Sequence, residues 1–488
     1  MARKQSKKRY IWSRFFYEST NGFSCRFFID ATGTLEEVEE KTAEALFEVG
    51  RAILKTYMEH LDEAFMKDRE KGLRHLGMRE RDVLTRFGVV RVKRRYYRDG
   101  EGNTRFLLDE ALGWDKGGMA MTPSVEAQAL KMCSEISYRK SAEHLSFFLV
   151  EDIGHSLLHR RVQIRGSERA EEKGRLAEEL FSWGVLPPSE RRETQRLFME
   201  ADGCMISLQR EGRRKHEVKV GISYEGWQRV GEEKWRTKNR RACLSAADGG
   251  AFLSQWSADL ATVYDHAKVK EVIWSSDGAS WLAKGPGLFS CTHAQLDRFH
   301  LKRSLTRALG FSSEASRLFS LACRGKASEV VKELEKHLEK ATDERKRKRI
   351  AEALSYISSL SAWLSDWRKV LPAGEDDRSP GAIESNVDKL AADRFKKRGM
   401  SWRPQGADHM CQIIELKENG ELPSFISKRV KTADARKAQA AMAYLRKEVR
   451  RDPEAWLKKN MPLLQSRSGD PWVKEVLAGL AGYDKLAC

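Results

Sequence analysis

The first strong pattern along the chain is helical. Between residues 36 and 73, apolar side chains recur at three- and four-residue spacings, which predicts one amphipathic helix. Residues 82–98 change to alternation, with Val90 and Val92 opposed to charged neighbours. Alternation predicts a strand, and DGEGN at 99–103 predicts a turn, so we expect a β-hairpin or small sheet. Its basic face suits either a phosphate backbone or plain contact with water.

Three short helical patterns follow between residues 122 and 164. Short helices joined by tight turns, with basic side chains on the third, are typical of a helix-turn-helix that enters a major groove. The alternative is an ordinary α-helical domain. The polar side chains expected to be exposed on the third helix are His155, His159, Arg160, Arg161 and Arg165.

From Arg196 onward the pattern becomes that of an α/β sheet. Three strands are predicted by RLFMEADGCMISLQR, KHEVKVGISYEGW and RRACLSA, a helix by AFLSQWSADLATVYDH, and a short buried strand by KEVIWSSDGASW. Another strand precedes a helix that starts near Phe299. Three strands, a helix and then strand–helix repeats give the order of an RNase H-like α/β sheet. Residues 301–371 then predict a helical insertion, and a further helix is expected at 382–398.

The predicted fold is therefore an α/β RNase H-like catalytic domain with an all-α insertion, plus an N-terminal α+β DNA-binding region. The expected regions are a helical, dimerising segment at 1–80; a β-hairpin with a helix-turn-helix-like region at 81–185; the catalytic domain at 194–302 and 373–425; the insertion at 303–372; and a basic helical tail at 426–488.

Composition adds an expected partner and compartment. The 488 residues include 89 Lys and Arg against 71 Asp and Glu, a formal net charge of +18. Such a basic excess favours a nucleic-acid partner, although a solvated basic surface gives the same count. The eight cysteines form no C-x-x-C pair, which argues against a zinc ribbon and fits a reducing compartment. The chain shows no signal peptide or membrane-length apolar run, so we expect a cytoplasmic protein with no membrane partner.

Three carboxylates stand where a nuclease-type metal site would need them. Cleavage or transfer of a DNA phosphodiester uses two divalent ions held by oxygen ligands from separate segments. Asp202 lies inside an apolar strand, where an unpaired carboxylate is costly to bury. Asp277 follows Val-Ile-Trp-Ser-Ser at the carboxyl end of a strand, where open α/β sheets place their sites. Glu384 opens a helix after a loop.

Each of these residues also has an ordinary interpretation. Asp-Gly is a common turn signal and occurs four times, at 99, 202, 248 and 277. Glu384 alone is a first-turn glutamate that the helix dipole favours. Glu200 shares a strand face with Asp202 and is its nearest rival.

Several segments together resemble a known family. EADGCMISLQR, HEVKVGISYEGW, VIWSSDGASW, LDRFHLKRSL and ESNVDKLAADRFKKRGMSW resemble the ISLre-two family of bacterial insertion-sequence transposases, which are Mutator-like DDE enzymes, and TRFGVVRVKRRYYRD and ISYRKSAEHL also look like it. The resemblance covers roughly residues 80–420 in the family's order. It implies an RNase H-like domain whose catalytic and metal-binding residues are Asp202, Asp277 and Glu384, holding Mg²⁺ or Mn²⁺, in all two ions.

The resemblance points to further positions. Asp297 and His300, in DRFH, fall where related enzymes keep a residue near the active site, but a capping aspartate and a histidine satisfied by its neighbours fit equally well. Trp402 falls where an aromatic ring stacks on a base at the transposon end, or else anchors its loop in the core. Basic side chains around it are expected to grip phosphates or to form a solvated face: Arg394, Lys396, Lys397, Arg398 and Arg403. The family often has an acidic residue at the position of Gly203, and this departure puts activity in doubt.

The sequence thus predicts a DNA transposase that cleaves transposon ends and joins the freed 3′-hydroxyl to target DNA. Its expected partners are terminal inverted repeats, target DNA and further copies of itself, with Arg160 and Arg161 among the DNA contacts. Two alternatives remain: a nuclease of the same fold without strand transfer, and a catalytically inactive DNA-binding descendant of a transposase.

Overall fold

The computed structural model describes residues 11–16, 24–29, 34–212, 214–265 and 267–428. It is a mixed α/β protein that divides into two compact units. Unit 1 comprises Met1–Ala129, Ala142–Leu157 and Pro423–Cys488, and unit 2 comprises Leu130–Ser141 and Leu158–Leu422. Of the predicted tail at 426–488, only the end of α15 (Leu422–Ser427) and Lys428 are described; the remainder lies outside the described residues.

Unit 1 contains a long helix beside a small sheet. Helix α1 (Leu35–Lys67) begins at Thr34, whose side chain and that of Glu37 form a capping box. The sheet has the order β5-β4-β3-β6, and its strands are β3 (Arg74–Thr85), β4 (Gly88–Arg98), β5 (Thr104–Arg105) and β6 (Ala120–Met121). The unit also contains α2 (Leu107–Ala111) and an antiparallel pair, β1 (Ile11–Phe16) and β2 (Ser24–Ile29).

The strand alternation predicted over 82–98 is confirmed on β4, where Val90 and Val92 are buried in the core beneath α1. The predicted boundary at residue 80 is wrong, because it falls inside β3. The first half of β3 is largely exposed and polar, so it has no apolar alternation to read. The hairpin turn lies at residues 86–87, and Gly88 beside it has a φ of +87°, which glycine adopts readily.

Three helices follow: α3 (Pro123–Glu135), α4 (Tyr138–Leu149) and α5 (His155–Trp183). His155 and Arg160 on α5 are exposed as predicted, but Arg161 and Arg165 are buried. From Leu158 onward α5 belongs to unit 2, so the predicted domain end at 185 is also wrong. The helix buries a basic face there because it meets acidic partners, with Lys173 Nζ 2.7 Å from Glu415.

The centre of unit 2 is a five-stranded sheet with the order β11-β8-β7-β12-β13. Strands β7, β8 and β11 are antiparallel neighbours, whereas β12 and β13 run parallel to β7. Their bounds are β7 (Arg196–Ser207), β8 (Lys215–Tyr224), β11 (Arg241–Ser245), β12 (Glu271–Ser276) and β13 (His293–Leu296). A small hairpin of β9 (Trp227–Arg229) and β10 (Trp235–Thr237) lies between β8 and β11 in the sequence.

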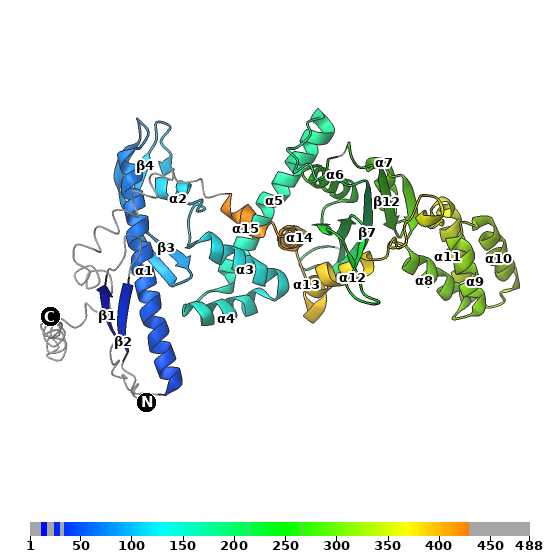
Figure 1. Cartoon of the computed structure of the whole chain (residues 1–488), viewed down its shortest axis with the longest axis horizontal. Coiled ribbons are helices and arrows are strands. Elements are labelled where there is room, and N and C mark those ends of the chain that lie inside the picture. Colours follow the sequence, from blue (N-terminus) through cyan, green and yellow to red (C-terminus); the bar gives the residue numbers. More distant parts are fainter. Residues whose placement is uncertain (1–10, 17–23, 30–33, 213, 266, 429–488) are drawn as a thin grey trace, which may run out of the picture. The chain divides into compact units, whose positions relative to one another are not determined.

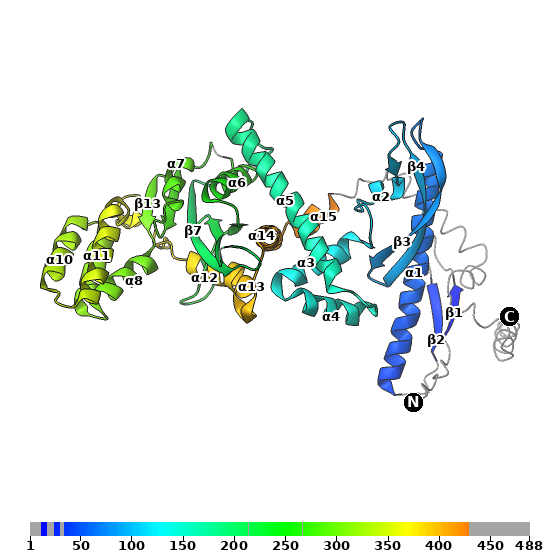
Figure 2. The same cartoon turned by 180° about the vertical axis from the view of Figure 1, so that it is seen from behind.

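Alternation along β7 gives the sheet two different faces. Met199 and Ala201 pack into a core with Phe252 and Trp256 of α6 (Gly249–Ala261). Glu200 and the residues two positions away from it therefore point to the other face. Helix α14 (Pro404–Glu418) packs against β11 at the edge of the sheet (Figures 1 and 2). This second face of β7 thus places the carboxylates of Glu200 and Asp202 between the buried side chains of Phe198 and Cys204.

The insertion consists of α8 (Arg298–Leu309), α9 (Ser313–Cys323), α10 (Ala327–Lys340) and α11 (Glu344–Ser359), which share their own apolar core. Figure 2 shows these helices on the β13 side of the sheet, away from α14. Short helical turns precede them in the sequence at Leu282–Lys284 and α7 (Gly285–Leu288), and follow them at Ser361–Trp363 and Trp367–Lys369.

The helix predicted over 382–398 is present as consecutive helical turns over 383–395, but its middle turn is π-helical. It consists of α12 (Ile383–Val387), a π-helical turn at Asp388–Ala392, α13 (Asp393–Phe395) and a 3₁₀ turn at Lys397–Gly399. A π-helical turn inserts one extra residue and rotates the remainder of the helix, and such turns are frequent at functional sites. Glu384 lies in the piece before this turn.

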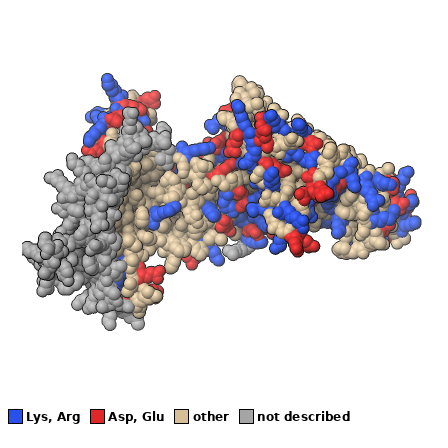
Figure 3. Space-filling model, in the orientation of Figure 1, with Lys and Arg blue, Asp and Glu red and all other residues tan. Residues whose placement is uncertain are grey.

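Surface charge does not by itself mark a site. On the face of unit 2 seen in Figure 3, Lys and Arg side chains are interspersed with Asp and Glu, so the net positive charge is not gathered into one broad patch there. None of the described helices pairs a membrane-crossing length with a sufficiently apolar sequence.

Candidate metal centre

Three aspartates stand at the same level of the sheet, one within β7 and one directly after each of the neighbouring parallel strands β12 and β13. Ser276 of β12 pairs with Ala201 of β7 and with Leu296 of β13. The next residues along the chain from these three are Asp202, Asp277 and Asp297. The parallel register therefore brings together residues that are 20 to 95 positions apart along the chain.

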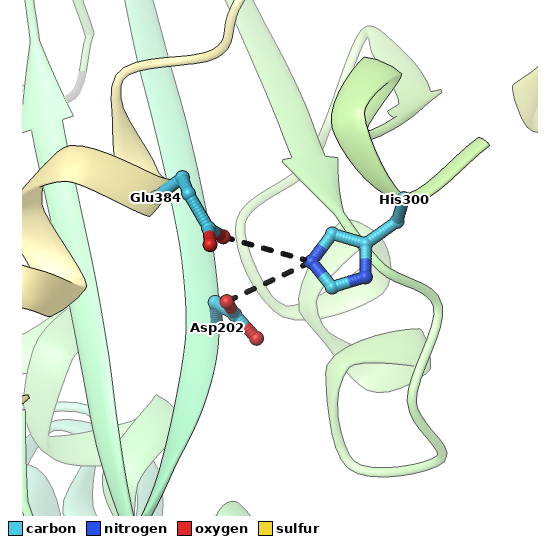
Figure 4. A group of neighbouring side chains, drawn as sticks. All are labelled: Asp202, His300 and Glu384. Atoms are coloured by element: carbon cyan, nitrogen blue, oxygen red, sulfur yellow. Dashed lines mark ion pairs between the residues drawn. The ribbon is translucent and has the colours of Figure 1, made fainter. Parts of the chain in front are cut away.

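The carboxylates of Asp202 and Glu384 converge with the imidazole of His300 (Figure 4). One potential ligand atom from each residue lies within 4.8 Å of the others. His300 Nε2 is 3.8 Å from Asp202 Oδ2 and 3.9 Å from Glu384 Oε2. Asp202 and His300 are largely buried, while Glu384 is half exposed, so the group is open to solvent on the side of α12.

Asp297 has a positioning role in this arrangement. Its buried carboxylate caps α8 and accepts a hydrogen bond from the backbone N–H of His300 at 3.0 Å. This cap fixes the first turn of α8, from which the His300 side chain reaches the two carboxylates. Asp297 was open to two interpretations, a residue near the active site or a helix cap, and the structure shows the helix cap.

Asp277 lies beside the three-residue group rather than within it. Its carboxylate accepts a hydrogen bond from the backbone N–H of Ala279 at 2.9 Å. Burial raises the pKa of Asp277, and the negative charge of Asp202 raises it further. The predicted triad is thus brought to one place, but His300, which the sequence indicated only weakly, occupies the position nearest to Asp202 and Glu384.

Glu200 is fully buried and holds the segment that carries Glu384. Its carboxylate accepts hydrogen bonds from the hydroxyl of Tyr224 at 2.6 Å and from the backbone N–H groups of Ala382 at 3.1 Å and Ile383 at 3.2 Å. All of these donors lie within the protein, so Glu200 supports the site instead of competing with Asp202 for a metal ion.

Gly203 is explained by a neighbour. A Cβ atom at this position would lie 2.1 Å from a carboxylate oxygen of Glu217 on β8. Glu217 therefore fills the space that an acidic residue at 203 would need, and its charge also raises the pKa of Asp277. No signal in the sequence marks Glu217, because it is one of many charged residues on alternating strands.

Trp402 does not offer a ring for base stacking. It is only 8% exposed, packs against Phe395, and donates a hydrogen bond from Nε1 to the Phe395 carbonyl at 3.2 Å. Its backbone pairs with the chain after β7. Of the two interpretations of Trp402, the structure agrees with the second, because these contacts anchor the loop in the core.

The basic residues near Trp402 differ in their exposure to solvent. Arg394 is buried and donates to the carbonyl of Cys133 at 2.8 Å, so it cannot grip a phosphate. Burial lowers the pKa of its guanidinium. Arg403, Lys396 and Lys397 are exposed, and the side chain of Arg398 lies outside the described residues.

The donor set fits a divalent cation. His300 Nε2 is buried and has no hydrogen-bond partner among the described residues, although an acidic oxygen lies on each side of it. Burial, and next the charge of Asp202, raise the pKa of Glu384, which is expected when carboxylates crowd together without a cation. Carboxylate oxygens suit Mg²⁺ and Mn²⁺, and an imidazole favours the transition metal.

Comparison with known proteins places the chain in a family. The profile described as "Uncharacterised protein family (UPF0236)" matches residues 29–429. The "UPF0236 protein in vanSb 3'region" of Streptococcus gallolyticus is 25% identical over 403 residues, which cover 79% of this chain and 83% of the relative. A UPF0236 protein of Caldanaerobacter subterraneus, whose name joins eleven locus labels, is 22% identical over 395 residues, or 79% of this chain and 78% of the relative. The chain therefore belongs to the UPF0236 family.

Proposed function

We propose that the protein is a DDE-type DNA transposase that cleaves the ends of a mobile element and joins them to target DNA. The observation that carries the proposal is the convergence of Asp202, Glu384 and His300, with Asp277 beside them, where the carboxyl ends of β12 and β13 meet the centre of β7. Such a crevice is where open α/β sheets bind their ligands.

The fold of unit 2 supports the same proposal. Three antiparallel strands followed by two parallel ones, in the order β11-β8-β7-β12-β13, are the arrangement we expect of an RNase H-like sheet. The helical insertion lies between β13 and α12 in the sequence, where the helical pattern of residues 301–371 predicts it.

The side chains have distinct roles in the proposed reaction. Divalent ions bound here would supply Lewis-acid chemistry for phosphodiester cleavage and transfer. Asp202 holds its carboxylate on a rigid strand, whereas Glu384 approaches from a short helix. In the first step water attacks the phosphorus at the element's end, and the bond to the 3′ oxygen breaks. In the second step that 3′-hydroxyl attacks a target phosphate and releases a target 3′-hydroxyl, so no covalent bond to the protein is needed.

Charge and family distribution also support a mobile-element enzyme. The net charge of +18 favours a polyanionic partner. A name that joins eleven locus labels of one bacterium is what we expect of a protein encoded at many places in a genome. Transposition produces such dispersal, and it acts on DNA in the bacterial cytoplasm.

A strand-transfer assay tests the proposal. Full-length protein is incubated with Mn²⁺, supercoiled target DNA and a DNA that carries the end of its own element, uncut in one reaction to report cleavage and pre-nicked in another to report joining. We expect joined products that require the terminal sequence. Cleavage without joining would instead indicate a nuclease, and DNA binding without either reaction would indicate a non-catalytic DNA-binding protein.

A further inference from the structure

Two adjoining pockets lie between α8 and α11 beside the candidate metal centre. The smaller, of about 320 Å³, is lined by Asp277 and His300 together with arginines of both helices. The larger, of about 900 Å³, leads away from the centre. Three arginines line both pockets and make them continuous: Arg303, Arg307 and Arg349.

The larger pocket is strongly basic. Five cationic side chains line it, and its one acidic residue, Asp343, already accepts a hydrogen bond from the backbone N–H of Lys346 as the cap of α11. Among the described residues, no acidic side chain forms an ion pair with any of the five cations. All five are exposed: Lys302, Arg303, Arg307, Lys346 and Arg349. Five positive charges that line one pocket without acidic partners favour an anionic ligand with several charges.

The pockets are linked to the candidate metal centre by shared lining residues. Arg303 and Arg307 line the smaller pocket together with Asp277 and His300 of that centre. The lining of the smaller pocket carries both signs of charge, since Asp277 and Glu352 line it together with its arginines. An extended polyanion can thus pass from the basic pocket to the acidic centre.

Two aromatic rings line the larger pocket beside the cations. Phe311 is fully exposed, and Phe299 is about half exposed. Exposed phenyl rings among arginines and lysines match the faces of unstacked bases better than they match inorganic phosphate or a closed duplex.

We propose that this pocket, defined by the five cations with Phe299 and Phe311, binds a DNA strand of single-stranded character next to the phosphate that is cleaved. The cations bind its phosphates and the two rings stack on its bases. The identity of the ligand as DNA rests on the proposed function. The existence of a polyanion site rests on the geometry and charge of the pocket alone.

Binding by full-length protein in EDTA tests the proposal without requiring catalysis. The probe is a fluorescein-labelled oligothymidylate of about 20 nucleotides, titrated at about 50 to 300 mM KCl and followed by anisotropy. The double variant Arg307→Gln/Arg349→Gln removes two pocket cations. The matched control, Lys332→Gln/Lys348→Gln, removes the same charge from exposed positions of α10 and α11 outside both pockets.

We expect the pocket variant to reduce the slope of log Kd against log salt by about 1.4, or about 0.7 for each lost phosphate contact. Phe311→Ala is expected to weaken binding of the single strand about five-fold or more, with little effect on a duplex of the same length. The control should keep the wild-type slope, and all variants should keep the wild-type melting temperature because the replaced side chains are exposed.

An unchanged slope in the pocket variant, or an equal loss in the control, would overturn the proposal. Tighter, pocket-dependent binding of oligouridylate would assign the pocket to RNA and overturn the DNA assignment. The wild-type protein could also prove unable to cleave or join DNA. If the pocket variant still lost oligothymidylate binding, the result would support the pocket while the proposed function fails.

Discussion

A carboxylate oxygen of Glu200 lies 3.2 Å from the backbone nitrogen of Ile383, although 183 positions separate the two residues. This hydrogen bond ties the centre of β7 to the first turn of α12. Asp202 lies two residues after Glu200, and Glu384 lies one residue after Ile383. One buried side chain therefore fixes the separation of two proposed metal ligands.

Replacing Glu200 by Gln is expected to reduce DNA cleavage roughly 10- to 100-fold, because misplacing Glu384 by a fraction of an ångström is costly. The amide nitrogen of Gln cannot accept a hydrogen bond, so one backbone donor of the loop loses its partner. Affinity for DNA should not change. Tyr224→Phe removes a donor to Glu200 but leaves both bonds to the loop, so it should retain most activity; an equal loss there would argue against loop anchoring.

Asp202→Asn should abolish cleavage, by on the order of 10³-fold or more, while DNA binding is retained. The substitution keeps the size of the side chain and removes only its charge. Asp248→Asn is the matched control, because it also changes an Asp-Gly pair. Asp248 caps α6, a role that Asn fills equally well. Gel analysis of end cleavage measures the loss of activity, and anisotropy with the same DNA measures the affinity.

Removing the imidazole tests the composition of the metal centre. His300→Ala should weaken Mn²⁺ binding at least about ten-fold and narrow the advantage of Mn²⁺ over Mg²⁺ in cleavage, because carboxylates alone discriminate less between these ions. Calorimetric titration of Mn²⁺ into the protein measures the affinity. His337→Ala, on the exposed part of α10, serves as the control. Unaltered Mn²⁺ affinity in His300→Ala would remove His300 from the ligand set.

Trp402→Ala should lower the free energy of unfolding by about 3–5 kcal/mol, the usual cost of deleting a large buried aromatic side chain. Trp402→Phe should recover much of this loss, because it keeps the ring contact with Phe395. DNA affinity of the folded Trp402→Phe variant should equal that of the wild type. A selective loss of affinity for frayed ends would revive a stacking role for the indole.

A buried charge network predicts how the contact between α5 and the sheet responds to acid. Asp259 lies 2.8 Å from Arg169 and 3.0 Å from Arg241. Burial alone would raise the pKa of Asp259, but the charges of Arg241, Arg169 and Lys173 lower it below its ordinary value of 3.8. Because the folded-state pKa is lowered, the stabilisation is complete above pH 3.8 and is lost as the pH falls through the folded-state pKa.

Asp259→Asn should therefore destabilise the protein by about 1–3 kcal/mol near neutral pH, since Arg169 and Arg241 lose their shared carboxylate and keep only their other acidic partners. The difference in melting temperature from the wild type should narrow only as the pH falls below 3.8. Calorimetric scans from about pH 7 to about pH 3 measure it. A difference that is constant over this range would contradict the assigned role.

The sequence by itself determined the local structure wherever side-chain periodicity is strong. The strands around Asp202 and Asp277 lie where their patterns predict them, because burial of a strand requires apolar residues at regular positions in the sequence. No pattern in the sequence predicts the π-helical turn after Glu384, since the helical period on each side of it is normal. Buried arginines such as Arg161 are misjudged as exposed for a related reason: charge in a sequence reveals nothing about the partners that can compensate for it.

Only the tertiary structure decided which candidates meet. The parallel register of β7, β12 and β13 sets Asp202, Asp277 and Asp297 side by side, and the cap at Asp297 aims His300 at Asp202 and Glu384. Glu200 and Asp202 have similar carboxylate chemistry and the same strand face, yet Glu200 accepts hydrogen bonds from three donors in other segments. Asp202 accepts one from the adjacent backbone N–H of Gly203, and its second oxygen lies toward His300. Spacing along a chain cannot separate such a pair, because hydrogen-bond partners that come from distant segments are fixed only when the chain folds.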